Sequence, residues 1–141
     1  MINLFELVEE IHKKFLEKYY EIFEGMEDKA ELSERDFHYL RIIFETGKIN
    51  LTEFSKLSKV SKPAGTKIVN KYLKKGYITK EISKEDKRFS YIQLSDEMKK
   101  FLEKDQQIAN SIYESFLTVL NENERKQLEK LLVKIKNGFE K

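Results

Sequence analysis

Apolar residues recur every three or four positions along most of this 141-residue chain, and that spacing restricts it to a largely helical fold. The pattern predicts a long amphipathic helix at the start of the chain that ends near Gly25. A second long stripe, from Met98 to Leu120, and a third, from Leu128 to Phe139, predict two more helices at the end. The first stripe consists of Leu4, Leu7, Val8, Ile11, Phe15, Tyr19, Ile22 and Phe23.

Capping signals divide the rest of the chain into shorter helices. Gly47 and Gly76 stand where two of these helices should end. A small polar residue stands where each helix should begin, because its side chain can accept a hydrogen bond from a free backbone amide. The start signals are Ser33 with Asp36, Asn50 with Glu53, Ser61 with Pro63, Ser95, and Asn121 with Glu124.

Between the short helices and the long ones the periodicity changes to that of a β-hairpin. Tyr77, Ile78 and Ile82 precede a charged stretch, and a strand returns through Phe89 to Leu94. Four helices, a hairpin and two helices give a mainly α fold with a small β-hairpin wing. We therefore expect one domain over 1–141, with a winged helix–turn–helix core at 33–95 and helical dimerisation regions at 1–25 and 96–141.

Charge is distributed unevenly along the chain. Residues 1–46 have a net charge of −6, residues 47–92 of +8, and residues 93–141 of zero. A basic middle region is typical of a module that binds a polyanion, and double-stranded DNA is the partner that a helix–turn–helix suggests. The alternative for such a charge run is a solvated surface.

Residues 61–76 have the composition expected of a recognition helix, because they include five lysines and no acidic residue. Lys67 and Asn70 can bond base edges, whereas short or apolar groups can approach thymine methyls. Lys71 and Lys74 are better placed for phosphates. The predicted contacts in this helix are Ser61, Lys62, Pro63, Ala64, Thr66, Lys67, Asn70, Lys71 and Lys74.

The long apolar stripe that begins at Met98 exceeds what a small winged core can cover, so it needs a partner surface. The first and last helices offer matching stripes, which favours a two-fold homodimer. Such symmetry places two recognition helices about 34 Å apart and predicts a pseudo-palindromic operator. Packing of the three helices within one chain is the alternative.

These features resemble the MarR family of bacterial transcription regulators over nearly the whole chain. The resemblance lies in Leu32-Ser33 with Asp36, the capped helix at Asn50, Ser61 to Ala64, Gly76, Asp86-Lys87-Arg88, and Gln93-Leu94-Ser95. It implies that Arg88 enters a minor groove, that Asp86 orients it, and that Lys84 and Lys87 belong to the same DNA-binding wing. Three positions depart from the family pattern: Gly65, Met98 and the pair Phe54-Ser55.

The resemblance also implies a small aromatic or amphipathic effector that binds between the dimer helices and the winged core. Candidate lining residues combine aromatic rings with polar groups, as a small-molecule site requires, although ordinary core packing explains them better. They are Phe15, Tyr19, His38, Arg41 and Phe44. Binding would favour a dimer whose recognition helices no longer fit the operator.

The composition does not support a catalytic function. The chain has no cysteine, and its two histidines, His12 and His38, have no metal partners at helical spacing. Of the two, we expect His38 to be partly buried. No phosphate-binding glycine loop, export signal or membrane-spanning stretch is present, which favours a cytoplasmic protein without metal or cofactor.

Two functions follow from this sequence. The first is a homodimeric, ligand-responsive DNA-binding repressor. The second is a winged-helix module that uses its basic face to bind an acidic protein or RNA. The acid-free helix and the wing arginine favour the first.

Overall fold

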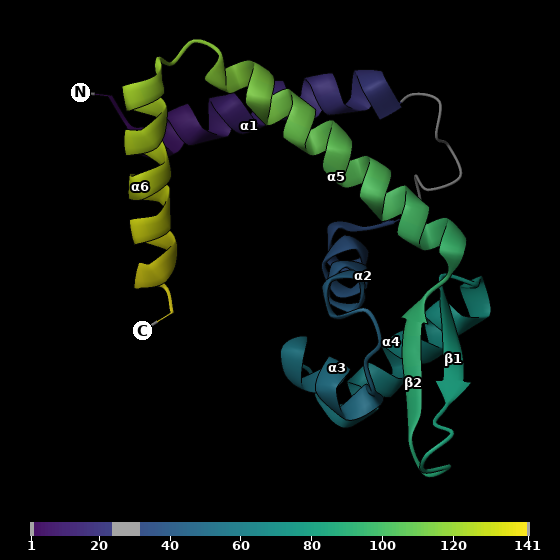
Figure 1. The fold of residues 1–141 in the computed structure, drawn as a ribbon. Coiled ribbons are helices and arrows are strands. Elements are labelled where there is room, and N and C mark those ends of the chain that lie inside the picture. Colours follow the sequence, from purple (N-terminus) through teal and green to yellow (C-terminus); the bar gives the residue numbers. More distant parts are fainter. Residues whose placement is uncertain (1, 24–31, 141) are drawn as a thin grey trace. The chain divides into compact units, whose positions relative to one another are not determined.

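Helices form most of the chain in the computed structural model, which describes residues 2–23 and 32–140 (Figure 1). The elements are α1 (Leu4–Phe23), α2 (Glu34–Thr46), α3 (Leu51–Leu57), α4 (Lys62–Lys75), β1 (Ile78–Ile82), β2 (Ser90–Leu94), α5 (Asp96–Leu117) and α6 (Glu122–Gly138). This order confirms the mainly α, winged helix–turn–helix fold. The predicted end of the first helix at Gly25 lies outside the described residues.

The chain divides into two compact units. The winged unit is Met26–Gln106, and the helical unit is Met1–Gly25 with Gln107–Lys141. The boundary falls inside α5, so the first part of this helix belongs to the winged unit and the rest to the helical unit.

The predicted helix caps are confirmed. The Ser33 hydroxyl accepts from the Asp36 amide at 3.0 Å while the Asp36 carboxylate accepts from the Ser33 amide, and Asn121 makes the same reciprocal box with Glu124. Ser61 caps α4, and Gly76 ends it in the left-handed conformation. Because these signals are local, the sequence places the helix boundaries closely.

The core of the winged unit takes apolar side chains from each of its elements. Full burial of one such side chain is worth roughly 1.5–3 kcal/mol, so this cluster holds the unit together. The buried side chains are Leu40, Ile43, Ile49, Phe54, Val69, Tyr72, Ile78, Ile92, Met98, Phe101 and Leu102.

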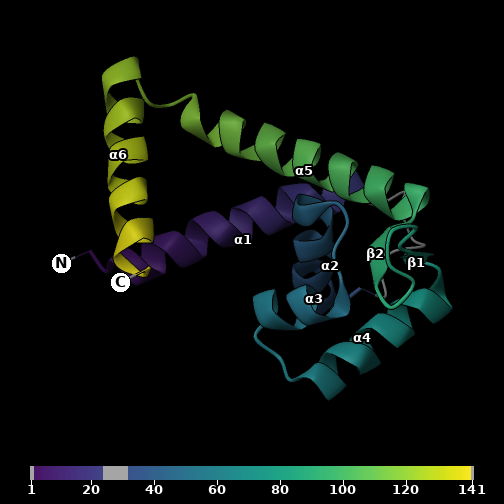
Figure 2. The ribbon, with the colours of Figure 1, turned by 60° about the horizontal axis from the view of Figure 1, so that its bottom comes forward.

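The hairpin is anchored to the loop before α3. β1 and β2 pair antiparallel, with Ile78 opposite Leu94. Ile49 adds an isolated bridge, because its amide donates to Ile92 O at 3.0 Å and its carbonyl accepts from the Ile92 amide at 2.8 Å. This bridge holds the base of the hairpin beside α4. A short turn joins α3 to α4 (Figure 2).

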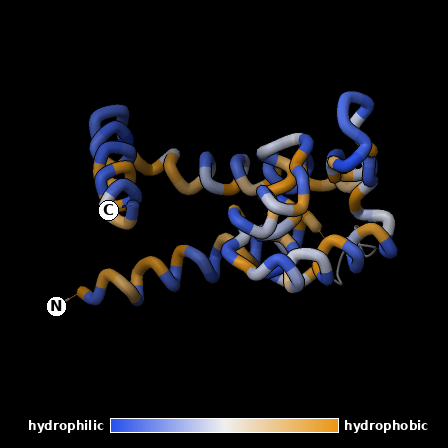
Figure 3. Tube along the Cα trace, turned by 90° about the horizontal axis from the view of Figure 1, so that it is seen from below, coloured by the Kyte–Doolittle hydropathy of each residue, from blue (hydrophilic) through white to orange (hydrophobic). Residues whose placement is uncertain are grey.

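The helical unit contains α1, the second part of α5, and α6. The Phe15 ring of α1 stacks on Tyr113 of α5 with ring centroids 4.7 Å apart, and Arg125 of α6 pairs with Glu114 of α5. Neither α1 nor α6 has a buried residue, and hydrophobic and hydrophilic residues alternate along the tube of α1 (Figure 3). The apolar sides of these two helices are thus largely exposed.

Candidate nucleic-acid interface

Helix α4 has a buried side and a cationic side. Gly65, Val69 and Tyr72 are buried in the winged unit. Among the predicted contacts, Ala64 and Thr66 are half-buried, and the other seven are exposed: Ser61, Lys62, Pro63, Lys67, Asn70, Lys71 and Lys74. Since the helix contains no acidic residue, this exposed side presents only positive charge to a polyanion.

The first turn of α4 approaches α3 closely at Gly65. A Cβ built on Gly65 would lie 2.1 Å from the Ser55 hydroxyl oxygen and 3.2 Å from its Cβ. A glycine inside a helix reflects either close packing against a neighbour or a locally soft helix. The structure supports close packing. It also shows that Gly65 and Ser55, which both depart from the family pattern, lie next to each other.

Helix α4 is tied to the start of α2 through Asp36. The Tyr72 hydroxyl donates to Asp36 Oδ1 at 2.7 Å, and Lys71 Nζ lies 3.6 Å from the same oxygen. Burial raises the pKa of Asp36, but the hydrogen bonds from Tyr72 and the Ser33 amide outweigh it, so the pKa ends below its ordinary value. Asp36 thus caps α2 and fixes the orientation of α4, a role that the sequence did not reveal.

Two cations of the exposed side have different surroundings. Lys71 faces a carboxylate, whereas Lys67 forms no ion pair with any described residue. A lysine without an internal partner can bind a phosphate or a base without first breaking an ion pair.

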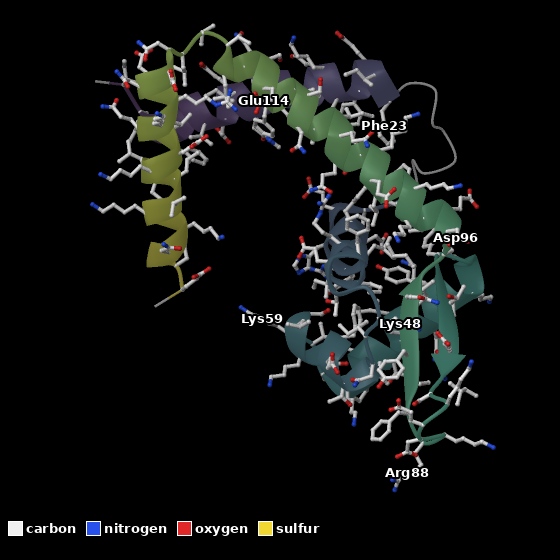
Figure 4. All side chains as sticks on the ribbon, in the orientation of Figure 1. Phe23, Lys48, Lys59, Arg88, Asp96 and Glu114 are labelled. Atoms are coloured by element: carbon white, nitrogen blue, oxygen red, sulfur yellow. The ribbon has the colours of Figure 1, made fainter. Side chains whose placement is uncertain are left out.

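The wing holds its arginine in a fixed orientation. Arg88 Nε donates to Asp86 Oδ1 at 3.1 Å, and Arg88 Nη2 donates to Asp86 Oδ2 at 2.9 Å, which is a two-point contact. The Arg88 hydrogen bonds lower the pKa of Asp86. Arg88 lies at the end of the hairpin (Figure 4), and Lys84 and Lys87 are also exposed there. The predicted pairing of Asp86 with Arg88 therefore exists in this structure.

The basic stretch is longer than the recognition helix itself. Residues 54–80 include eight lysines and no acidic residue. Three of these lysines lie outside α4, and counting charge only from Ser61 left them out of the sequence prediction. They are Lys56, Lys59 and Lys80, and all three are exposed.

The candidate effector residues fall in both units. Phe15 and Tyr19 lie in the helical unit, where their rings stack on each other. In the winged unit, His38 is exposed, so the expected partial burial is wrong, and Arg41 pairs at 3.3 Å with the buried Asp105 of α5. The sequence could have indicated that Asp105 is buried, because it occupies an inward position of the apolar stripe of α5.

Phe44 borders a groove of about 440 Å³ in the winged unit. The groove lies between the end of α2, the two strands and the start of α5. Its other lining residues are Ile43, Gly47, Lys48, Thr79, Gln93, Leu94, Ser95, Asp96 and Lys99. An aromatic ring beside polar groups is the environment expected of a small-molecule site.

Two further features bear on the class of protein. Across residues 2–23 and 32–140, no group of three histidine or carboxylate side chains is arranged to hold a metal ion. No helix among the described residues is long and apolar enough to cross a membrane.

The comparisons with known proteins agree with this geometry. A model of the MarR family matches residues 32–89. YpoP of Bacillus subtilis (strain 168), an HTH-type transcriptional regulator, is 30% identical over 103 residues, which cover 73% of this chain and 70% of that protein.

Solved structures show the same fold at low sequence identity. MepR of S. aureus bound to ethidium bromide aligns with a TM-score of 0.74 and 17% identity, over 98% of this chain and 97% of that one. Wild-type apo MarR from E. coli aligns with a TM-score of 0.60 and 21% identity, over 96% and 97%. NadR in complex with 4-hydroxyphenylacetate aligns with a TM-score of 0.57 and 16% identity, over 96% and 93%.

Proposed function

The chain belongs to the MarR family of DNA-binding transcriptional regulators, and on that premise we propose that it is a homodimeric, ligand-responsive repressor of a pseudo-palindromic operator. The observation that carries the proposal is the acid-free exposed side of α4 beside a wing whose arginine is held by a carboxylate. Residues 33–95 form the DNA-binding core, and 1–25 and 96–141 serve dimerisation. Transcriptional regulation is also the assignment of its B. subtilis relative, so we propose no catalytic activity.

In the proposed complex, α4 lies in the major groove and the wing in the adjacent minor groove. Lys67 and Asn70 read base edges, while Lys71 and Lys74 contact phosphates. Arg88 enters the minor groove, where its guanidinium is favoured over an ammonium because it is more weakly hydrated. The two-fold axis sets the half-sites about one helical turn apart.

The proposed effector is a small aromatic or amphipathic molecule. Two structures with this fold carry aromatic ligands, ethidium in MepR and 4-hydroxyphenylacetate in NadR. For this chain, the lining candidates are Phe15, Tyr19, His38, Arg41 and Phe44. The effector would act by stabilising a dimer with a recognition-helix spacing that does not match the operator.

The test begins with light scattering of the full chain. Binding is then measured to DNA from upstream of its own coding sequence and to shuffled DNA of the same length, over a salt series. A dimer that prefers its own DNA, with affinity that falls steeply with salt, supports the proposal. A monomer without preference contradicts it and favours an acidic protein or RNA as the partner of the basic face.

Three single variants assign the roles of individual contacts. Lys67→Ala should reduce the preference for operator over shuffled DNA, because it removes a base contact. Lys74→Ala should weaken binding to both DNAs alike and lower the salt slope by about one for each protomer of the dimer. Arg88→Ala should weaken binding without affecting stability, since its side chain is 85% exposed. Equal losses for Lys67→Ala and Lys74→Ala, or full tolerance of Arg88→Ala, contradict these roles.

A further inference from the structure

Lys59 has a backbone conformation that, in the described part of the chain, is otherwise found only at glycines. Its φ is 57°, and it is the one non-glycine residue with positive φ among residues 2–23 and 32–140. Gly47 and Gly76, the other residues with positive φ there, also end helices. A side chain in this region crowds the backbone, so glycine is the usual choice.

The hydrogen bonds around Lys59 show why the conformation is required. The Val60 amide donates to Ser55 O at 3.0 Å, and the Lys59 amide donates to Lys56 O at 3.2 Å. This is the Schellman arrangement that closes a helix, and its residue after the cap must be left-handed. The turn between α3 and α4 depends on this geometry, which glycine would supply without steric cost.

Lys59 also lies in a strongly cationic environment. It is exposed, forms no ion pair with any described residue, and points away from the winged unit at the end of α3 (Figure 4). It lies within the acid-free stretch 54–80, between Lys56 and Lys62. The positive end of α4 begins three residues later, so an anion held here would meet several favourable fields at once.

We infer that Lys59 is a phosphate-binding residue, retained in a strained turn because its charge extends the DNA-binding surface beyond α4. Strain that persists in an exposed turn needs a compensating role, and a cation two residues before the cap of the recognition helix provides one. The inference rests on the proposed function. It adds a contact from the helix–turn–helix turn to those made by the recognition helix and the wing.

Three variants of the full chain test this role. Lys59→Gly should raise the melting temperature by roughly 2–4 °C, because the strain is relieved. It should also weaken binding to upstream and shuffled DNA alike, by about five- to tenfold for each protomer of the dimer at roughly 0.1 M salt, and lower the salt slope by about one per protomer. Lys59→Asn should show the same loss of affinity, because asparagine tolerates the left-handed conformation but carries no charge. Lys59→Arg should retain it.

Three results with these variants would contradict a role for the charge of Lys59. Unchanged affinity in Lys59→Gly overturns the inference, and so does a loss in Lys59→Arg equal to that in Lys59→Gly, because charge would then not be the cause. Weaker binding in Lys59→Gly with full affinity in Lys59→Asn also overturns it, since glycine flexibility would explain the loss. Absence of DNA binding by the unaltered protein would instead refute the proposed function itself.

Discussion

A buried serine hydroxyl occupies the space that a side chain on Gly65 would need. The Ser55 hydroxyl has no hydrogen-bond partner among the described residues, and the position of a Gly65 Cβ would be only 2.1 Å away. Glycine inside a helix costs about 1 kcal/mol relative to alanine, whereas overpacking costs roughly 1–3 kcal/mol. The two effects oppose each other, and the second should prevail here.

Gly65→Ala should therefore lower the free energy of unfolding by about 1 kcal/mol in urea denaturation, despite the better helix propensity of alanine. Adding Ser55→Ala should recover part of this loss, because it removes the nearer of the two clashing atoms. Gly138→Ala is the matched control, since a Cβ there meets no atom within 4 Å, and it should cause no loss. A stabilised Gly65→Ala protein would show that the serine rotates away freely.

Helices α2 and α4 are joined by a hydrogen bond between a tyrosine and an aspartate. The Tyr72 hydroxyl of α4 meets the Asp36 carboxylate of α2 at 2.7 Å. Burial is the largest cause that raises the pKa of Tyr72, and the bond to Asp36 raises it further. The folded protein therefore favours a neutral tyrosine and an ionised aspartate.

The stabilising effect of this bond should depend on pH at both ends of the scale. Because the pKa of Asp36 is lower in the folded protein, its contribution is present above about pH 4 and is lost as pH falls through the folded value. Because the pKa of Tyr72 is higher in the folded protein, its contribution is present below about pH 10 and is lost as pH rises further. The bond is thus strongest between these limits.

Tyr72→Phe should lower the free energy of unfolding by about 1 kcal/mol near neutral pH, because it removes this hydroxyl and keeps the ring. Urea denaturation at a series of pH values checks it. The difference between the two proteins should narrow below about pH 4 and above about pH 10. A difference that is constant with pH would mean that the hydroxyl contributes only packing.

Elements were predictable from the sequence where their signals are local. Ser33, Asn50, Ser61 and Asn121 cap the helices as expected, because a cap depends on residues three positions apart. The left-handed residue at Lys59 had no glycine to mark it, and the bridge between Ile49 and Ile92 joins distant residues. Neither follows from periodicity.

In the candidate site, too, local features were predictable from the sequence and contacts between distant residues were not. The charge of α4 and the pairing of Asp86 with Arg88 are short-range, so the sequence predicted both. The Tyr72–Asp36 and Arg41–Asp105 contacts span 36 and 64 positions, and only the fold brings them together. The residues of the DNA-binding surface could therefore be predicted from the sequence, whereas the contacts that orient this surface could not.

The exposed apolar side of α6 is the feature that the proposed dimer must explain. Ile135 is 59% exposed and Phe139 is 86% exposed, and both lie on the same side of the helix as Leu128. Val133 is 53% exposed but lies roughly 140° around the helix from Leu128. The two sides of α6 therefore offer a test in which exposure is matched and direction differs.

Ile135→Glu should shift the protein from dimer to monomer in light scattering, because it places a charge where the partner's apolar residues would pack. Its affinity for operator DNA should fall with the dimer, since one recognition helix alone contacts a single half-site. Val133→Glu introduces the same charge at similar exposure and should leave both the mass and the affinity unchanged. If both variants remained dimeric, the apolar side of α6 would lie outside the interface, and α1 and α5 would have to supply it. If both became monomeric, a general effect of charge on α6 would explain the result better than a directed interface.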